Sequence, residues 1–176
     1  MKSVPFSVLA LGAGLLLAGC SSNQIPNCPS AAALADTATI TGFRPGAPAD
    51  PSGEAYTATI ATVNNSCSFD RKTSQTTSSL SFTVRATRAP RADSAAYSLP
   101  YYVAVTQGER LLSKQTYTMQ VRFAPGSAVA QADESIDQTT IHLEKGHQPA
   151  DYQILVGFQL TDAQRAYNEK RRRYLP

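Results

Sequence analysis

The side chains best suited to covalent or metal chemistry in this 176-residue chain are three cysteines and two histidines. Cys28 and Cys67 match neither the spacing of a zinc ribbon nor a CxxC redox motif. Beyond the apolar run at the start, the sequence contains no GxSxG turn, no HExxH helix and no glycine loop for phosphate. No spacing of serine, histidine and aspartate selects a catalytic triad. We therefore expect no catalytic residues, no cofactor and no enzyme activity.

One weak grouping has the donor types of a metal site. His142 and Glu144 share one face of a predicted strand, and His147 and Asp151 follow in the next loop. A closed metal site demands a tighter ligand set than two histidines and two carboxylates spread over a strand and a loop. We favour solvated surface positions for these four residues and expect no metal.

A second grouping is basic. Arg85, Arg88 and Arg91 run from the exposed face of a predicted strand into its loop, and Tyr101 or Tyr102 lies in the next strand. Such a patch could hold an acidic ligand such as a sugar phosphate. Charge on exposed strands also prevents edge-to-edge aggregation, and we favour that role.

The first residues have the pattern of an export signal. Lys2 precedes an uncharged run from Val4 to Gly19 that ends in small residues. The run is shorter than the roughly 20 residues of a membrane-spanning helix, and it contains Pro5 and Gly12. We therefore expect residues 1–19 to be removed.

The end of this run, Leu17-Ala18-Gly19-Cys20, resembles the lipobox of bacterial lipoproteins. The resemblance implies a diacylglyceryl thioether on the Cys20 sulfur, cleavage before Cys20 and usually a further acyl chain on the new amine. Two acyl chains hold a protein stably on a bilayer. Ser21 and Ser22 occupy the positions after Cys20, where an aspartate commonly signals retention in the inner membrane. The expected location is the periplasmic face of the outer membrane, with residues 20–29 as lipidated cysteine and short tether.

Export places Cys28 and Cys67 in an oxidising compartment as an even pair, which predicts one disulfide. Removal of the signal leaves 157 residues, the usual size of a single domain. Fifteen basic residues then face 13 acidic ones, so the overall charge does not favour nucleic acid as a partner. Residues 161–176 hold five basic and two acidic residues, and the excess positive charge therefore lies at the C-terminal end.

The elements that must position these residues are predicted by hydrophobic alternation. Leu80, Phe82 and Val84 alternate with polar residues, as Tyr117, Met119 and Val121 do further along the chain. Similar runs occur at Thr37–Phe43, Tyr56–Phe69, Leu99–Thr106, Thr139–Leu143 and Tyr152–Leu160, with glycine- and proline-rich turns between them. About seven antiparallel strands without intervening helices predict an immunoglobulin-like β-sandwich over residues 30–160.

A basic helix and tail are predicted for residues 161–176, where Thr161-x-x-Gln164 is a capping-box pattern. Its apolar stripe is thin, so the helix packs on the sandwich or awaits a partner. Arg171, Arg172 and Arg173, with contact area from Tyr167 and Tyr174, could bind phosphate-bearing lipid headgroups or an acidic partner. Cations also offset the helix dipole at this end, so a solvated terminus is the simpler alternative.

Four segments carry a resemblance to known proteins: Phe43-Arg44-Pro45-Gly46, Cys67-Ser68-Phe69-Asp70, the run from Pro100 to Val105, and the run from Gly157 through Thr161 to Asn168. They resemble an uncharacterised family of small alphaproteobacterial envelope lipoproteins. The resemblance covers roughly residues 28–168 and supports the envelope location, but it assigns no binding or catalytic residue.

Together these features predict a lipoprotein anchored to a membrane and facing the periplasm, which acts as a non-catalytic accessory or structural subunit of an envelope assembly. The alternative is a periplasmic binding module for a carbohydrate, a lipid or a peptidoglycan fragment. Such a module needs a concave pocket with aromatic side chains.

Overall fold

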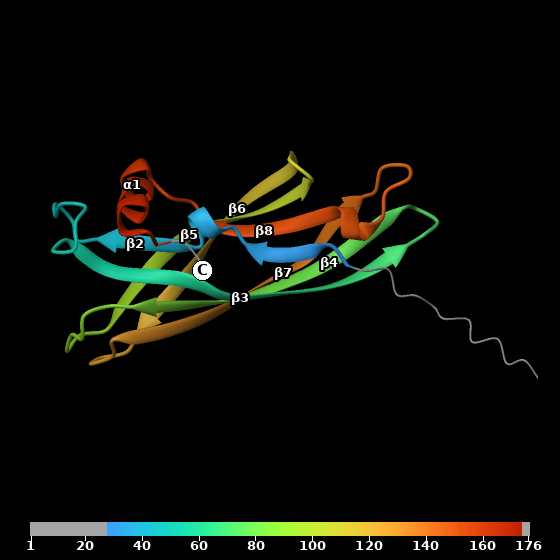
Figure 1. The fold of residues 1–176 in the computed structure, drawn as a ribbon. Helices are drawn as coiled ribbons and strands as arrows, with labels where there is room; N and C mark the ends of the chain where they lie inside the picture. The colour runs from blue at the N-terminus through green and yellow to red at the C-terminus, as the bar shows by residue number, and fades with distance from the viewer. Residues whose placement is uncertain (1–27, 174–176) are drawn as a thin grey trace, which may run out of the picture.

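The computed structural model describes residues 28–173, in which eight strands are followed by one helix (Figure 1). The predicted signal, Cys20, most of the tether and Tyr174 lie outside the described residues. The strands are β1 (Ser30–Ala33), β2 (Thr39–Phe43), β3 (Glu54–Asp70), β4 (Gln75–Thr87), β5 (Ala95–Gln107), β6 (Arg110–Phe123), β7 (Val129–His142) and β8 (Tyr152–Phe158). Helix α1 covers Asp162–Arg171, and short 3-10 turns cover Ala35–Thr37 (η1) and Pro149–Asp151 (η2).

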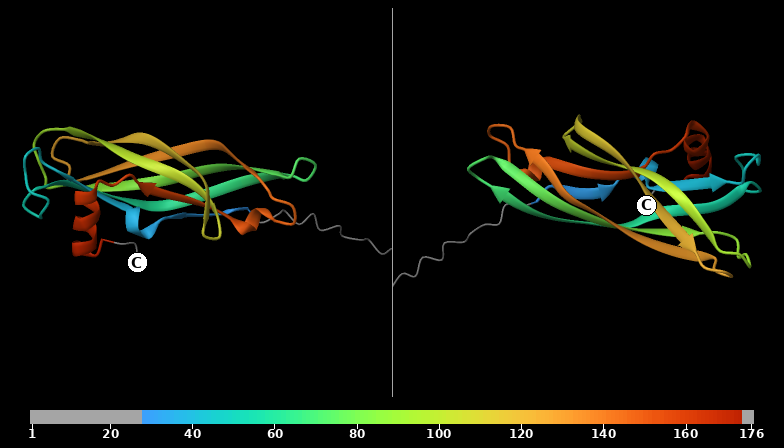
Figure 2. Two further views of the ribbon diagram at one scale, coloured as in Figure 1. Left: turned by 90° about the horizontal axis from the view of Figure 1, so that it is seen from above. Right: turned by 180° about the vertical axis from the view of Figure 1, so that it is seen from behind.

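The strands form two four-stranded sheets, in the orders β1-β8-β5-β6 and β2-β3-β4-β7. Every neighbouring pair is antiparallel except β1 and β8, which run parallel. Figure 2 shows the two sheets as the layers of one elongated sandwich. The predicted mainly β sandwich with a C-terminal helix is confirmed, with eight strands where about seven were predicted.

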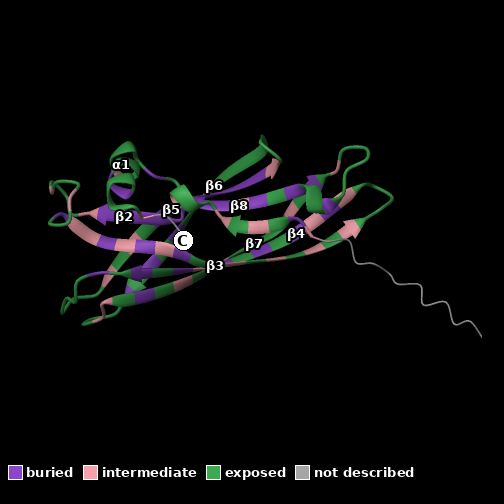
Figure 3. Ribbon diagram, viewed as in Figure 1, coloured by how far each residue is buried: buried purple, intermediate pink, exposed green. Residues whose placement is uncertain are grey.

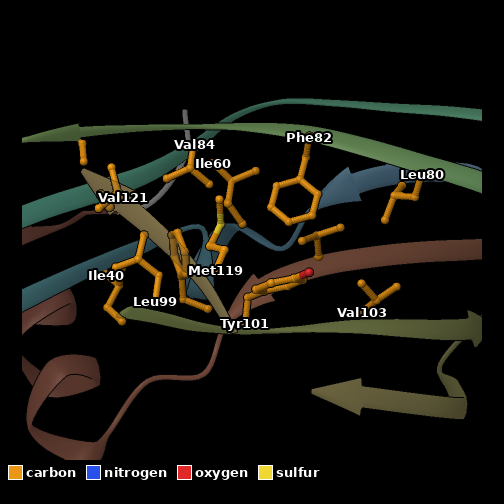
Figure 4. Packing of buried hydrophobic residues seen from close by; sticks show 14 of the residues in the cluster. Ile40, Ile60, Leu80, Phe82, Val84, Leu99, Tyr101, Val103, Met119 and Val121 are labelled. Atoms are coloured by element: carbon orange, nitrogen blue, oxygen red, sulfur yellow. The ribbon is translucent and has the colours of Figure 1, made fainter. Parts of the chain in front are cut away.

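The core lies between the sheets and follows the predicted alternation. Along β4, Leu80, Phe82 and Val84 are buried while the residues between them face outward (Figure 3). Phe82 meets Tyr101 of β5 edge to face across the sandwich, with ring centroids 5.2 Å apart (Figure 4). The largest fully buried side chains include Tyr101, Tyr152, Phe82, Phe123 and Phe158. Aromatic rings from both sheets therefore hold the two layers together.

The strands differ most from the sequence prediction at β1 and β7. β1 was not predicted, because its four residues, Ser-Ala-Ala-Ala, are too few and too uniform to alternate. β7 begins at Val129 rather than Thr139. The alternation did not predict this earlier start because the inward positions of β7 include the small Ala130 and the charged Glu134. Pairing with β4 extends β7 where its own side chains give no apolar pattern.

Helix α1 begins at the predicted capping box, in which the backbone N–H of Gln164 donates to the Thr161 hydroxyl at 3.3 Å. It packs on β2 through polar groups as much as apolar ones. The Gln164 side chain donates to the Thr41 carbonyl at 2.9 Å, and Asn168 Nδ2 donates to the Thr39 carbonyl at 2.7 Å. These bonds explain how a helix with a thin apolar stripe docks on the sandwich. Within residues 28–173, no helix has the length and hydropathy to cross a membrane.

Candidate interaction surfaces

The predicted disulfide is present between Cys28 and Cys67, whose Cα atoms lie 5.6 Å apart. It joins the segment before β1, in one sheet, to β3 in the other. The Asn65 side chain reinforces this junction by donating to the Pro29 carbonyl at 2.9 Å. The start of the folded body is therefore fixed to the sandwich by a covalent bond and a hydrogen bond.

Cys28 is bonded to Cys67, three residues before the end of β3, so it lies toward the end of the sandwich that holds the β3–β4 turn, which we call the entry end (Figure 1). The β3–β4 turn and the loop after β7 form the same end and are joined where Leu143 N–H donates to the Ser74 carbonyl at 2.8 Å. The opposite, distal end consists of the β2–β3, β4–β5 and β6–β7 loops. A tether attached before Cys28 would thus hold the entry end, and leave the distal end furthest from the attachment.

The residues considered for a metal site do not converge. His142 Nδ1 lies 3.2 Å from the Gln75 side chain, whereas Glu144 pairs with Arg110. His147 lies 3.3 Å from Asp151, whose pKa is lowered mainly by the backbone N–H of Gln148. Among the described residues, no group of three or more histidine, cysteine, aspartate or glutamate side chains is placed to hold a metal.

The three arginines considered as a basic patch lie in different environments. Arg85 is exposed on the outer face of β4, and Arg91 lies in the distal loop with its Nε 3.7 Å from Asp93. Arg88 turns inward just after β4 ends and is only 7% exposed. Tyr101 and Tyr102 are buried. The single patch expected from the spacing is therefore not formed.

Arg88 instead holds the distal loops together. Its guanidinium donates to the carbonyls of Asp93, Ser127 and Ala124 at 2.7, 3.1 and 3.3 Å. The same group lies 4.8 Å from the centre of the Phe123 ring, a cation–π contact. The role of Arg88 is structural, since its donors face backbone oxygens of two loops.

A hollow of about 630 Å³ lies at the distal end. Its lining combines aromatic rings with two guanidinium groups and comprises Phe43, Arg44, Pro45, Gly46, Ala47, Ala55, Arg91 and Tyr97. Arg44 also braces its own loop by donating to the carbonyls of Ser52 and Glu54. This surface has the aromatic and polar mixture that a binding module needs.

The C-terminal residues proposed to bind a partner divide into two groups. Arg173 is paired with Glu54 at 2.8 Å and donates to the hydroxyls of Thr41 and Thr57 at 2.7 and 2.9 Å. Tyr167 is buried and donates to the same Glu54 carboxylate. Burial and then this carboxylate raise the pKa of the Tyr167 hydroxyl, which keeps it protonated. Both side chains therefore hold α1 on the sandwich.

Arg171 and Arg172 remain exposed, as does Lys170 beside them. Glu54, the residue that engages Arg173, is 119 positions away in the sequence. No local sequence pattern distinguishes Arg173, which pairs with Glu54, from the exposed Arg171 and Arg172.

No family model, no curated protein and no solved structure matches this chain.

Proposed function

We propose that this chain is a lipid-anchored, periplasm-facing lipoprotein of the outer membrane, and that it serves as a non-catalytic accessory or structural subunit of an envelope assembly. The observation that carries the proposal is the disulfide that holds Cys28 in the half of an elongated sandwich that contains the entry end. Cys20 lies only eight residues earlier, which is at most about 29 Å of extended chain. Strand β3 has 17 residues and spans roughly 55 Å. Lipid on Cys20 would keep the entry end near the bilayer and let the distal loops project away from it.

The use of charged side chains agrees with a structural role. The guanidinium groups of Arg88, Arg44 and Arg173 donate to backbone carbonyls, hydroxyls and one carboxylate of the sandwich itself. The resemblance to small envelope lipoproteins supports the same location.

The lipid anchor is tested by replacing Cys20 with serine. We expect Cys20→Ser to abolish incorporation of radiolabelled palmitate and to leave uncleaved or mislocalised precursor, because serine cannot form the thioether. Ser22→Ala, two residues further on, is the matched control and should label like the wild type. Labelling of the Cys20→Ser variant at the wild-type level would refute the anchor.

The exposed C-terminal cations favour an acidic protein partner over lipid headgroups, because α1 lies in the half of the sandwich away from Cys28 (Figure 1). We expect Arg171→Ala combined with Arg172→Ala to weaken crosslinking to that partner in intact cells, and the wild-type interaction to weaken as salt rises. Arg85→Ala removes an exposed arginine of β4 and should leave the crosslink unchanged. Equal crosslinking by all three proteins would mean that these cations are only solvated.

A binding module for a carbohydrate, a lipid or a peptidoglycan fragment is a second candidate, favoured by the distal hollow with Phe43, Tyr97 and two arginines. Calorimetric titration of the mature protein with soluble peptidoglycan fragments distinguishes the two candidates. Saturable heat supports the binding module, and its absence favours the accessory subunit.

A further inference from the structure

We propose that the open edges of β6 and β7 form the interface of a twofold-symmetric dimer, in which β6 of each copy pairs antiparallel with β7 of the other. β6 and β7 are the last strands of their sheets, and neither pairs with a further strand within residues 28–173. An unpaired strand edge presents a row of backbone N–H and C=O groups that can pair with another chain. The proposal goes beyond the accessory role and does not depend on the lipid anchor.

Both edges lie along the same side of the sandwich. β6 contacts β7, whereas β1 and β2 form the other edge of each sheet. Ser113 and Gln115 of β6 line a hollow of about 220 Å³ together with Asp137 of β7. Lys114, which lies between the first two, is therefore level with Asp137 along the sandwich.

The edges of β6 and β7 carry opposite charges. The basic residues of β6, which has no acidic one, are Arg110, Lys114 and Arg122. The acidic residues of β7, which has neither lysine nor arginine, are Asp133, Glu134 and Asp137. Pairing of β6 with β6, or of β7 with β7, would bring like charges together, whereas pairing of β6 with β7 brings opposite charges together. Charge complementarity therefore selects a second copy of this chain as the partner.

Four of these charges are exposed on the outer faces of the sheets, because they alternate with inward-facing residues. They are Lys114, Arg122, Asp133 and Asp137. None of the four forms an ion pair within residues 28–173. The other two charges of these strands are already engaged, since Arg110 pairs with Glu144 and Glu134 faces Tyr101 in the core. The outer-face charges are thus available to a neighbouring strand.

A twofold axis parallel to the strands satisfies both pairings at once. Rotation about this axis exchanges the two layers, so that β6 of one copy continues in the same layer as β7 of the other. β6 ends and β7 begins at the distal end, so the two strands run in opposite directions and their pairing is antiparallel. Heights along the axis do not change, and Lys114 therefore meets Asp137 of the second copy. The interface is closed, because each copy uses both of its edges.

A break in β7 sets the length of the pairing. Gln138 has a φ of 63°, and the register between β7 and β4 shifts close by, between Ser78 and Leu80. Such an irregularity ends regular pairing along an edge. Residues 129–137 of β7 remain continuous and are level with residues 114–122 of β6, which is roughly 30 Å of strand in each of the two pairings.

Apolar surface is exposed on the same two strands. Of the four large hydrophobic residues that are exposed in the described part of the chain, three belong to β6 or β7: Leu111, Leu112 and Val129. Val129 lies at one end of the paired stretch, and the two leucines lie just beyond the other end. The interface therefore has apolar area to bury as well as charges to pair.

The arrangement also agrees with the proposed anchor. An axis parallel to the strands leaves both entry ends on the same side of the dimer, so lipid on Cys20 of each copy would reach one bilayer. Pairing of β6 with β6 requires an axis perpendicular to the sheets, which would turn the two entry ends in opposite directions.

Two charge-reversed variants test the pairing. Lys114→Glu combined with Arg122→Glu makes the edge of β6 acidic, and Asp133→Lys combined with Asp137→Lys makes the edge of β7 basic. Each variant alone places like charges at both pairings of its own dimer, so we expect its dissociation constant to rise about tenfold or more. An equimolar mixture of the two restores opposite charges in a mixed dimer, and the dissociation constant should return to within about threefold of the wild-type value.

The measurement is sedimentation equilibrium of the full mature protein in a density-matched detergent, at low salt and with micelles in excess over protein. Arg71→Glu combined with Lys72→Glu, in the exposed β3–β4 turn, changes the net charge as the β6 variant does and should leave the dissociation constant within about twofold. The wild-type dimer should dissociate as salt rises. Circular dichroism verifies the fold of each variant, and recovery on mixing shows that both remain competent to pair.

The proposal is overturned if the wild type stays monomeric up to about 0.1 mM, or if the mixture dimerises no better than the separate variants. A wild-type dimer that neither variant weakens would also overturn it. Pairing of like edges gives that result, because reversing every charge on one edge leaves like charges facing each other.

Discussion

Replacing Cys28 and Cys67 by alanine should lower the free energy of unfolding by about 4 kcal/mol. The disulfide joins residues 39 apart, and closing a loop of that length removes much of the conformational entropy of the unfolded chain. The measurement is urea unfolding of the oxidised mature protein, followed by circular dichroism. With a slope near 2 kcal/mol per molar urea, the midpoint should fall by roughly 2 M.

Two controls separate the loss of the bond from the loss of the side chains. Wild-type protein in reductant should unfold close to the midpoint of the double variant, because both lack the cross-link. Ser68→Ala changes an exposed residue beside Cys67 and should leave the midpoint within a few tenths of a molar. Coincident curves for oxidised wild type and the double variant would show that the bond contributes nothing to stability.

The disulfide has a local effect as well as a global one. β1 pairs with β8 over only four residues and lies at the edge of its sheet. The bond holds the chain two residues before β1 begins, so that little entropy remains to be lost when the strand pairs. The covalent attachment next to it therefore favours the pairing of this short strand.

Sequence patterns predicted those elements whose signal is local. The alternation of Leu80, Phe82 and Val84 identifies β4, and the capping box at Thr161 marks the start of α1. The cysteine pair could be predicted from an even count and from the export that the first residues lead us to expect. In each case the physical cause lies within a few residues or in the expected compartment, and no tertiary contact is needed to recognise it.

The surfaces could not be predicted because they depend on contacts between distant residues. Arg173 differs from Arg171 and Arg172 only through Glu54, which lies at the start of β3. Asn168 is buried only because α1 docks on β2, where its side chain donates to the Thr39 carbonyl, 129 positions earlier. The residue types in one stretch of chain do not indicate which distant residues will contact it.

Substitution of Arg88 should have the second large effect. Arg85 and Arg91 look equivalent to Arg88 in the sequence, but of the three only Arg88 is buried. We expect Arg88→Met to lower the free energy of unfolding by about 3 kcal/mol. The substitution removes charge-assisted hydrogen bonds to three carbonyls and the contact with Phe123. The loss is smaller than the sum of these contacts, since Nη1 of Arg88 is buried without a partner among the described residues and its own cost disappears too.

Arg85→Met is the matched control for this experiment, because it makes the same chemical change at an exposed position of β4 and should shift stability by less than about 0.5 kcal/mol. Urea unfolding of both variants measures the difference, and equal stabilities would refute the bracing role of Arg88.

The stability of an Arg88 variant also matters for any binding experiment at the distal hollow. Arg91 lies in a loop whose backbone Arg88 holds, so an Arg88 variant that lost a ligand would lose it through the displaced loop. Only a variant with normal stability and weaker binding identifies a side chain that touches the ligand.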